Sequence, residues 1–474
     1  MADVEQPALF PQAELDSQAT APALTDVQPT PDAESFRPAP RFNRPERDQG
    51  EMFTESLDQR LDADHPARVI WKLVEQLDLS SLYQQIQAVE GGVGRNASDP
   101  RVLFALCLYA CVEGVSSSRK LAKLCDDHRG FQWLRGGVPV NHHMLSNFFR
   151  DHQQLLDQLL TESLAGLLQE GLVELNCAAQ DGMRLRASAG KASFRRQATL
   201  EESLEDARKQ VAGLRAEREA EANGAAATVA TARERAARER AAREKEERIV
   251  KALEHVKEVA KQREARKKGD GDAARASTTD PEARIMKMPD GGFRPAFNVQ
   301  FATDTASGII LGVDVINQGT DAGQIEPMMT QTKERLGKVP DQVLIDGGYM
   351  AVDDIEKATE AGTTVFMPIK DAKKMLEKGR DPHERKPGDS DIIADWRKRM
   401  GTEMAKLIYK LRAQTAELTN AHMRNRGLYS IRVRGLVKVK TMLMWHVLAQ
   451  NLLRGEVLRA VRATSGGTPC AEAA

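Results

Sequence analysis

The sequence predicts an α/β protein in which a mixed β-sheet is flanked by helices. Residues 280–370 alternate short apolar runs with helical patterns, which is typical of strands and helices that share one sheet. Residues 54–172 show helical periodicity alone. Residues 198–271 are dominated by Ala, Glu, Arg and Lys, which predicts a long helical hairpin inserted into the α/β part of the chain.

Composition divides the 474 residues into five parts. The first part is rich in Pro, Ala, Gln and Asp, and such a segment buries too little apolar surface to fold. In chain order we expect a disordered tail at 1–53, an all-helical domain at 54–172, an α/β domain at 173–197 and 272–462, the inserted hairpin at 198–271, and a second disordered tail at 463–474.

The predicted hairpin carries apolar residues at the spacing of an a/d seam, which is typical of a coiled coil. These residues are Leu200, Leu204, Ala207, Val211 and Leu214 on the first helix, and Ile249, Leu253, Val256 and Ala260 on the second. Asn223 and Gly224 lie between the two runs, and we expect them to turn the chain.

The helical region before the sheet contains a segment, 116–152, that resembles a helix-turn-helix unit. Its last helix would expose a set of polar residues to DNA: Asn141, His142, His143, Ser146 and Arg150. A plain helical bundle explains the same pattern, because basic residues are few here. The sequence leaves both interpretations open.

Two aspartates stand at the ends of predicted strands. Asp181 ends the run 173–181, and Asp346 ends the run 339–346. Strands are also predicted at 293–304 and 308–317, so the two aspartates would close the first and fourth strands of the sheet. This order of elements is that of an RNase H-like sheet, in which the first and fourth strands lie side by side.

A third acidic residue, Glu417, lies on a predicted helix that follows the sheet, after a charged and irregular excursion at 371–399. Three carboxylates from two neighbouring strands and one helix suit a pair of Mg²⁺ ions, or Mn²⁺ ions, because such ions prefer oxygen ligands. Two ions about 4 Å apart activate a water or 3′-hydroxyl and stabilise the leaving oxygen in phosphodiester cleavage. We expect Asp181, Asp346 and Glu417 to be the metal ligands and catalytic residues, with Asp181 bridging the two ions.

Basic residues follow each of these carboxylates along the chain and are candidates to hold DNA phosphates. Tyr349, three residues after Asp346, would either stack on a base or simply pack. A solvated charged face is the alternative for the basic residues. The DNA-binding candidates are Arg184, Arg186, Lys191, Tyr349, Arg412, Arg424 and Arg426.

The whole-chain composition excludes several classes of protein. The formal net charge is -1, and the five cysteines have no framework spacing, which indicates buried thiols in a reducing compartment. No apolar run reaches the ~20 residues that span a bilayer, so we expect a cytoplasmic protein without a membrane partner. Neither a phosphate loop nor a dinucleotide fingerprint is found, and we expect no cofactor other than the metal.

Four motifs together resemble the DDE transposases of bacterial insertion sequences. They are Gln180–Gly182 (QDG), Asp280–Arg284 (DPEAR), Ile345–Tyr349 (IDGGY), and the set Tyr409, Arg412 and Glu417. The resemblance extends over residues 54–460. It implies metal-dependent cleavage and strand transfer at the inverted-repeat ends of a mobile element, recognition of those ends by the helical N-terminal domain, and a protein that works on double-stranded DNA as a homodimer. A related pattern places three residues between the Arg and the Glu, and a Lys seven positions beyond the Glu. Here four residues intervene, and Arg424 occupies the Lys position.

Other functions remain compatible with the sequence. A nuclease of the same fold would cut DNA without joining it. A degenerate transposase would bind DNA and do no chemistry. A coiled-coil scaffold built around 198–271 would leave the acidic trio and the β-rich half unexplained.

Overall fold

The computed structural model describes residues 55–88, 96–222, 229–349 and 351–464. The two predicted tails therefore lie almost entirely outside the described residues, as does the predicted turn at Asn223 and Gly224. In the part of the chain that the structure describes, no helix is both long enough and apolar enough to cross a membrane.

Seven helices precede the sheet within the described residues. Proline occupies the first turn of two of them, where its missing N–H is not needed, and the Asp99 side chain accepts a hydrogen bond from the amide of Arg101. The helices are α1 (Pro66–Glu75), α2 (Ser80–Tyr83), α3 (Pro100–Val112), α4 (Ser118–Asp127), α5 (Arg129–Arg135), α6 (His142–Asp151) and α7 (Gln153–Gln169).

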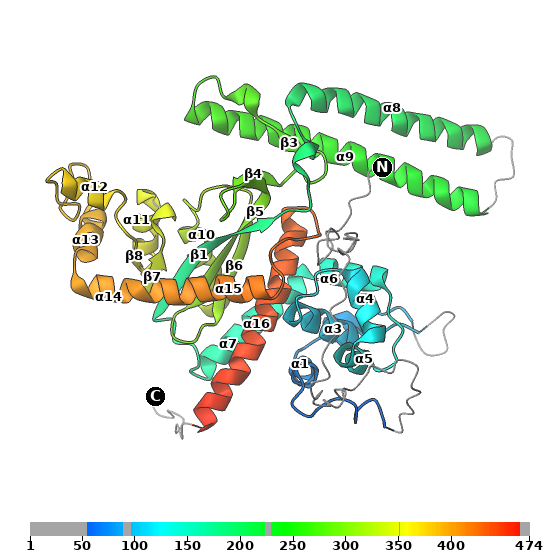
Figure 1. The fold of residues 1–474 in the computed structure, drawn as a ribbon, viewed down its shortest axis with the longest axis horizontal. Coiled ribbons are helices and arrows are strands. Elements are labelled where there is room, and N and C mark those ends of the chain that lie inside the picture. The colour runs from blue at the N-terminus through cyan, green and yellow to red at the C-terminus, as the bar shows by residue number, and fades with distance from the viewer. Residues whose placement is uncertain (1–54, 89–95, 223–228, 350, 465–474) are drawn as a thin grey trace, which may run out of the picture. The chain divides into compact units, whose positions relative to one another are not determined.

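These helices share a hydrophobic core with the last helix of the chain, α16 (Leu436–Thr464) (Figure 1). The Trp445 ring lies 4.5 Å from the Phe104 ring, centroid to centroid, and the indole N–H donates to the carbonyl oxygen of Phe149 at 3.1 Å. Helix α3 is buried nearly all round, which explains its continuous apolar sequence. The same core cluster continues into the sheet through Met183 and Leu185.

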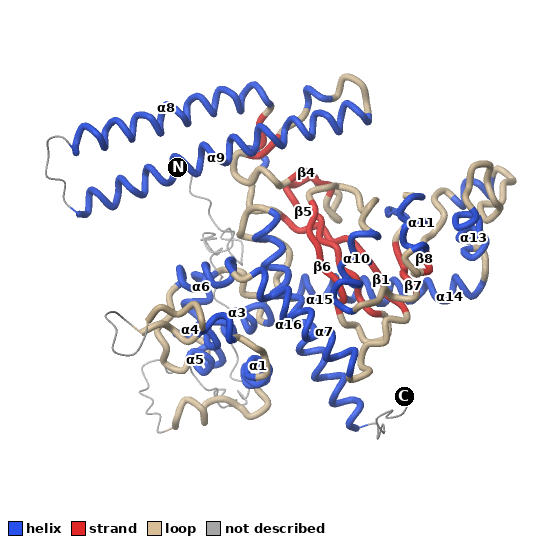
Figure 2. The backbone as a smooth tube through the Cα atoms, turned by 180° about the vertical axis from the view of Figure 1, so that it is seen from behind, coloured by secondary structure: helices blue, strands red, loops and turns tan. Residues whose placement is uncertain are grey.

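The main sheet has the order β4-β5-β1-β7-β8, and β6 also pairs with β5 (Figure 2). Strand β1 is antiparallel to β5 and parallel to β7. The strands are β1 (Cys177–Arg186), β4 (Arg284–Lys287), β5 (Phe293–Asp304), β6 (Ile310–Ile316), β7 (Gln342–Ile345) and β8 (Thr364–Phe366), and β2 (Phe194–Arg195) and β3 (Ala276–Ser277) form a separate small ribbon.

The prediction that the first and fourth strands are neighbours is confirmed, because β1 pairs with β7 and Gln180 lies opposite Ile345. The prediction that the first strand ends at Asp181 is wrong. Strand β1 continues for five residues to Arg186, and all five pair with β5. A carboxylate is tolerated within this strand because polar groups from a later helix cover it, as described below.

Helices on the sheet include α10 (Ile325–Leu336) and α11 (Val352–Glu360). The prediction of an irregular excursion at 371–399 is wrong, because this region contains α12 (Ala372–Glu377) and most of α13 (Asp391–Met400). The Ser390 hydroxyl caps α13 by accepting from the amide of Ile393, and Trp396 is fully buried. The segment was predicted to be irregular because its composition is polar, and α13 packs on the protein through only a few apolar residues.

The helix predicted to carry Glu417 has three parts. An α-helical part, α14 (Glu403–Arg412), leads into a single π-helical turn, η5 (Ala413–Glu417), and then into α15 (Leu418–Asn425). The segment crosses the sheet next to β1 and β7 (Figure 1). The described residues also form three short 3₁₀ turns: η2 (Lys191–Ser193), η3 (Gly271–Ala273) and η4 (Gly347–Tyr349).

The inserted segment forms two long helices, α8 (Gln197–Ala222) and α9 (Val229–Arg266). Ion pairs join Arg208 to Glu246 and Arg218 to Glu239, so the helices run antiparallel. Most of the predicted apolar positions are buried, including Leu200 and Val256, which pack with Ala274 and other residues at the base of the hairpin.

The DPEAR motif joins the end of this insertion to the start of α16. The amide of Gly435 donates to Oδ1 of Asp280 at 3.2 Å, and the amide of Leu436 donates to Oε2 of Glu282 at 2.8 Å. Both amides belong to the N-terminus of α16, where backbone donors lack helical partners and negative charge is favoured. Gly435 has φ +85°, and a Cβ there would lie 2.8 Å from Oε2 of Glu282.

Asp280 is fully buried, and burial raises its pKa to about 6. Its Oδ2 has no hydrogen-bond partner among the described residues. The folded protein therefore retains a proton that the unfolded chain releases at lower pH, and the contribution of Asp280 to stability is lost as pH rises from its ordinary pKa of 3.8 through about 6.

We predict that Asp280→Asn removes this pH dependence. The amide oxygen still accepts from Gly435, and no charge is buried. The difference in free energy of unfolding between the variant and the parent should change by roughly 2 to 3 kcal/mol in favour of the variant between pH 4 and pH 8. Chemical denaturation at each pH measures this difference. Asp290→Asn is the control: Arg294 lowers the pKa of Asp290, so its difference from the parent should change in the opposite direction. Parallel pH profiles for the parent and Asp280→Asn would contradict the assignment.

Candidate active site

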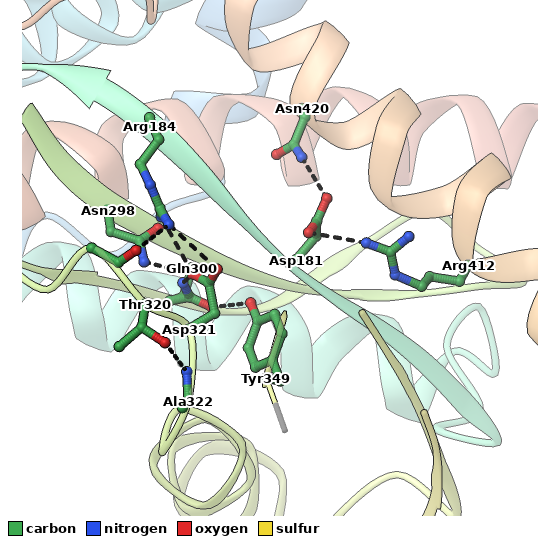
Figure 3. A network of polar contacts seen from close by, with 11 residues as sticks. Asp181, Arg184, Asn298, Gln300, Thr320, Asp321, Ala322, Tyr349, Arg412 and Asn420 are labelled. Atoms are coloured by element: carbon green, nitrogen blue, oxygen red, sulfur yellow. Dashed lines mark hydrogen bonds and ion pairs between the residues drawn. The ribbon is translucent and has the colours of Figure 1, made fainter. Parts of the chain in front are cut away.

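Asp181 projects from β1 toward the α14–α15 segment and is held there by two side chains (Figure 3). Arg412 donates to its Oδ1 at 3.1 Å, and Asn420 donates to its Oδ2 at 3.0 Å. Burial raises the pKa of the Asp181 carboxyl, and the nearby carboxylates of Asp346 and Asp321 raise it further, whereas Arg412 lowers it. The site therefore concentrates negative charge, and among the described residues Arg412 alone places a guanidinium against Asp181.

Asp346 directly follows β7 and is exposed at the edge of the same site. Its Oδ1 accepts a hydrogen bond from the amide of Gly347 at 2.7 Å. The Tyr409 hydroxyl, on α14, donates to the carbonyl oxygen of Ile345 at 3.1 Å and so fixes the end of the strand beside Asp346. Burial raises the pKa of Tyr409 to about 12, with smaller contributions from Asp346 and Asp181.

The π turn sets which residues of the helix face Asp181. Arg412 and Asn420 are eight positions apart, and in an uninterrupted α-helix they would point about 80° apart. Both nevertheless contact the same carboxylate. A π turn holds one more residue than an α turn, and this extra residue brings Arg412 and Asn420 back onto one face.

Glu417 is the last residue of the π turn, and its side chain is exposed. It precedes Asn420 by three positions, which makes the two side chains neighbours on the helix surface. Within the described residues, no three His, Cys, Asp or Glu side chains are gathered closely enough to bind a metal ion. The structure thus brings Asp181 and Asp346 together and places Glu417 on the helix that covers Asp181, without joining all three carboxylates.

A second polar cluster lies on the other face of β1, around Asp321 (Figure 3). The Asp321 carboxylate accepts hydrogen bonds from Asn298 at 2.5 Å and Gln300 at 2.7 Å, and it pairs with Arg184 at 3.3 Å. Gly182 makes room for it, because a Cβ at that position would lie 2.4 Å from Oδ1 of Asp321. The glycine of the QDG motif is therefore required by packing against this carboxylate.

Tyr349 connects this cluster to Asp346. Its hydroxyl donates to Oε1 of Gln300, and the ring is 1% exposed. The sequence left stacking on a base and simple packing open for this residue, and in the structure the ring is packed. Gln300 in turn donates to Asp321, so a chain of hydrogen bonds holds the turn that follows Asp346 against the sheet.

The predicted DNA-binding arginines differ in accessibility. Arg184 and Arg412 are largely enclosed by their pairs with Asp321 and Asp181. Arg426 is half-buried, and burial lowers its pKa. Three further candidates have more accessible side chains: Arg186 and Lys191 are exposed, and Arg424 is partly exposed.

Sequence reasoning missed two residues of this site, Asn420 and Asp321. The spacing of eight between Arg412 and Asn420 gave no signal, because it fits one helix face only when a π turn lies between them. Asp321 lies in the loop before α10, which begins at Ile325, and no strand or helix pattern marks this position. The glycine in QDG was the one available signal for a close neighbour at this position.

The donor groups at the site fit a hard divalent cation. Asp181 and Asp346 offer carboxylate oxygens, which Mg²⁺ prefers. Oδ1 of Asn420 is buried beside Asp181 without a hydrogen-bond partner among the described residues. A buried unpartnered oxygen next to a carboxylate is a place where a cation is favoured and a further anion is not.

Comparison with protein families gives two matches. Residues 55–151 match a family described as a transposase domain (DUF772), and residues 265–452 match the transposase DDE domain. Neither the curated proteins nor the solved structures contain a significant match. The second match includes Asp346 and Glu417 but begins after Asp181, which the inserted hairpin separates from the rest of the sheet. Because both transposase models match in the expected order, the chain belongs to the DDE transposases of insertion sequences.

Proposed function

We propose that this transposase cleaves DNA at the inverted-repeat ends of its insertion sequence and joins those ends to a target, with Asp181, Asp346 and Glu417 as its catalytic residues. One observation carries the proposal: Asp181 lies on β1, Asp346 directly follows the adjacent parallel strand β7, and the helix bearing Glu417 covers Asp181. Asp181 and Asp346 are 165 residues apart in the sequence, yet they lie close enough for the Asp346 carboxylate to raise the pKa of Asp181.

The strand order supports an RNase H-like sheet. Strands β6, β5, β1, β7 and β8 follow one another across the sheet, with β5 antiparallel to its neighbours and β7 and β8 parallel to β1. In this arrangement the first and fourth strands of the fold are central and adjacent, and their carboxylates meet a helix that follows the last strand.

Asp181, Asp346 and Glu417 would hold the divalent metal, Mg²⁺ or Mn²⁺. When bound, the metal activates the attacking oxygen and stabilises the leaving 3′-oxygen at the scissile phosphate. The protein's own groups prepare the site. Asn420 orients the Asp181 carboxylate, and Tyr409 holds the end of β7. The Asp321 cluster fixes the turn after Asp346.

Arg412 has a second role in this proposal. Its guanidinium now pairs with Asp181, and a bound cation would compete with it for that carboxylate. Arg412 would then be available to a phosphate oxygen, a partner suited to the planar guanidinium. The exposed Arg186 is the last residue of β1 and the exposed Lys191 follows five residues later, and both extend the basic surface for double-stranded DNA. As in other transposases of this group, we propose a cytoplasmic enzyme that acts as a homodimer on paired ends.

The test uses the purified full chain and a DNA fragment that carries the sequences flanking its gene. With Mg²⁺, we expect cleavage at the element ends and products joined to a target plasmid. Chelation with EDTA should abolish both, and added Mg²⁺ should restore them. Cleavage without joined products would support the alternative, a nuclease of the same fold. DNA that is bound but never cut with either Mg²⁺ or Mn²⁺ would indicate an inactive DNA-binding relative.

A further inference from the structure

A pocket of about 360 Å³ lies where the start of α4, helix α6, the loop before α16, and α16 itself meet. Its wall includes the serines Ser116, Ser117 and Ser118, the arginines Arg119 and Arg432, and Ser146 of α6. No Asp or Glu is among the described residues that line it. The pocket lies outside the acidic site, and the motifs used above do not explain it.

The N-cap residue Ser117 and the first residues of α4, Ser118 and Arg119, line this pocket. The Ser117 hydroxyl accepts from the amide of Lys120 at 3.4 Å, and the earlier amides of the first turn have no helical partners. The partial positive charge of a helix N-terminus favours an anion there. Arg119 and Arg432 are exposed, and neither forms an ion pair with a carboxylate among the described residues.

His446 is a second, independent feature that points to a ligand in this pocket. It lies on α16, lines the same pocket, and is only 4% exposed. Its Nδ1 has no hydrogen-bond partner among the described residues. Burial lowers the pKa of His446 to about 3, so the ring is neutral at physiological pH and retains a hydrogen-bonding capacity that the protein leaves unused.

The pocket is also connected to the strand that carries Asp181. Arg186, at the end of β1, donates from its amide to the carbonyl oxygen of Tyr429 at 3.2 Å and accepts from the amide of Ile431 at 2.9 Å. Residues 428–433 provide one side of the pocket, so this side is an extension of the main sheet. A ligand in the pocket would thus have a fixed relation to the acidic site.

We propose that this pocket binds a backbone phosphate of double-stranded DNA, between the N-terminus of α4, Arg119 and Arg432, with His446 as an inner hydrogen-bonding group. The inference deepens the proposed function, on which it rests, because it assigns the helical N-terminal region a phosphate contact on the same DNA. It also selects between the two interpretations left open for residues 116–152, in favour of DNA contact.

The test compares two neighbouring substitutions on α6. Ser146→Glu places a negative charge in the pocket, whereas Asn147→Glu adds the same charge at an exposed position that does not line it. Binding of a labelled DNA duplex is measured by fluorescence anisotropy over a range of salt concentrations. Ser146→Glu should weaken binding about tenfold, the effect of one lost charged hydrogen-bond group. The slope of log K against log salt should fall in magnitude by about 1, as for one lost phosphate contact. Asn147→Glu should have a smaller effect on both the DNA affinity and the salt slope.

A second pair of variants removes charge. Arg119→Ala/Arg432→Ala should reproduce the effect of Ser146→Glu, and Lys123→Ala/Arg129→Ala, which removes the same charge from nearby exposed positions, should not. Equal losses in both pairs would overturn the proposal in favour of a general charge effect, and unchanged DNA binding in the first pair would also overturn it. If inorganic phosphate titrated by calorimetry binds the parent but DNA binding ignores all these changes, the pocket is a small-anion site.

These outcomes are separate from those of the proposed function. Cleavage by the Ser146→Glu variant at saturating DNA should still require Mg²⁺, because the acidic site is intact. If Ser146→Glu binds DNA like the parent and the parent cuts DNA, the pocket proposal fails and the transposase mechanism stands. If the parent binds DNA and never cuts it, while Ser146→Glu weakens that binding, the pocket proposal stands and the transposase mechanism fails.

Discussion

Asp346→Asn is expected to abolish cleavage of the element ends while DNA binding persists. The carboxylate of Asp346 is exposed at the end of β7 and accepts one backbone hydrogen bond, which an asparagine oxygen can also accept. The fold should therefore survive, and the loss should fall on metal binding. Since metal stabilisation of the reacting phosphate contributes several kcal/mol, we expect a decrease of about 10³-fold or more in the cleavage rate.

The same assay with Asp181→Asn and Glu417→Gln tests the other two assignments. Asp353→Asn is the matched control, because Asp353 is an exposed acid on the adjacent helix α11 and has no proposed role. DNA binding by each variant is measured alongside cleavage. A variant that cuts at the parent rate with Mg²⁺ would show that its residue is not a metal ligand, and equal losses in Asp353→Asn would show that the assay reports damage to the fold.

Much of the sheet could be predicted because its information is local. An apolar run that ends in an aspartate identified β1 and β7, and the order of strands and helices predicted that the two are neighbours. The boundary at Asp181 was wrong for a tertiary reason. Arg412 and Asn420, 231 and 239 residues away, satisfy a carboxylate that would otherwise have to leave the sheet.

The remaining parts of the site depend on contacts that no local pattern records. Asp321 lies in a loop, and it is held by side chains from two strands and opposed by a glycine. Tyr349 is buried and its hydroxyl donates to Gln300, whereas the sequence alone left packing and base stacking open. The loop after α15 pairs with Arg186 at the end of β1 and lines the pocket proposed to bind phosphate, and nothing in residues 428–433 indicates a partner at Arg186.

Four residues separate Arg412 from Glu417, whereas the related transposase pattern has three. The π turn accommodates this additional residue. This leads to the last prediction, which uses two single deletions of exposed residues. Deleting Gln414 should convert the π turn into an α turn and leave Glu417 on the same face as before, now four positions after Arg412. We expect this variant to remain folded and to cut DNA.

Deleting Leu418 also removes the extra residue and keeps Arg412 and Asn420 on one face, but it rotates Glu417 by about 100° away from its place. Cleavage should fall about 10³-fold, as for the loss of a metal ligand. In the shortened helix Ala416 takes the former position of Glu417, so adding Ala416→Glu to the Leu418 deletion should restore cleavage. Thermal unfolding of all three variants identifies any that lose the fold. If the Gln414 deletion is folded and inactive, or if Ala416→Glu restores nothing in a folded protein, the orientation of Glu417 on this helix is not what the chemistry requires.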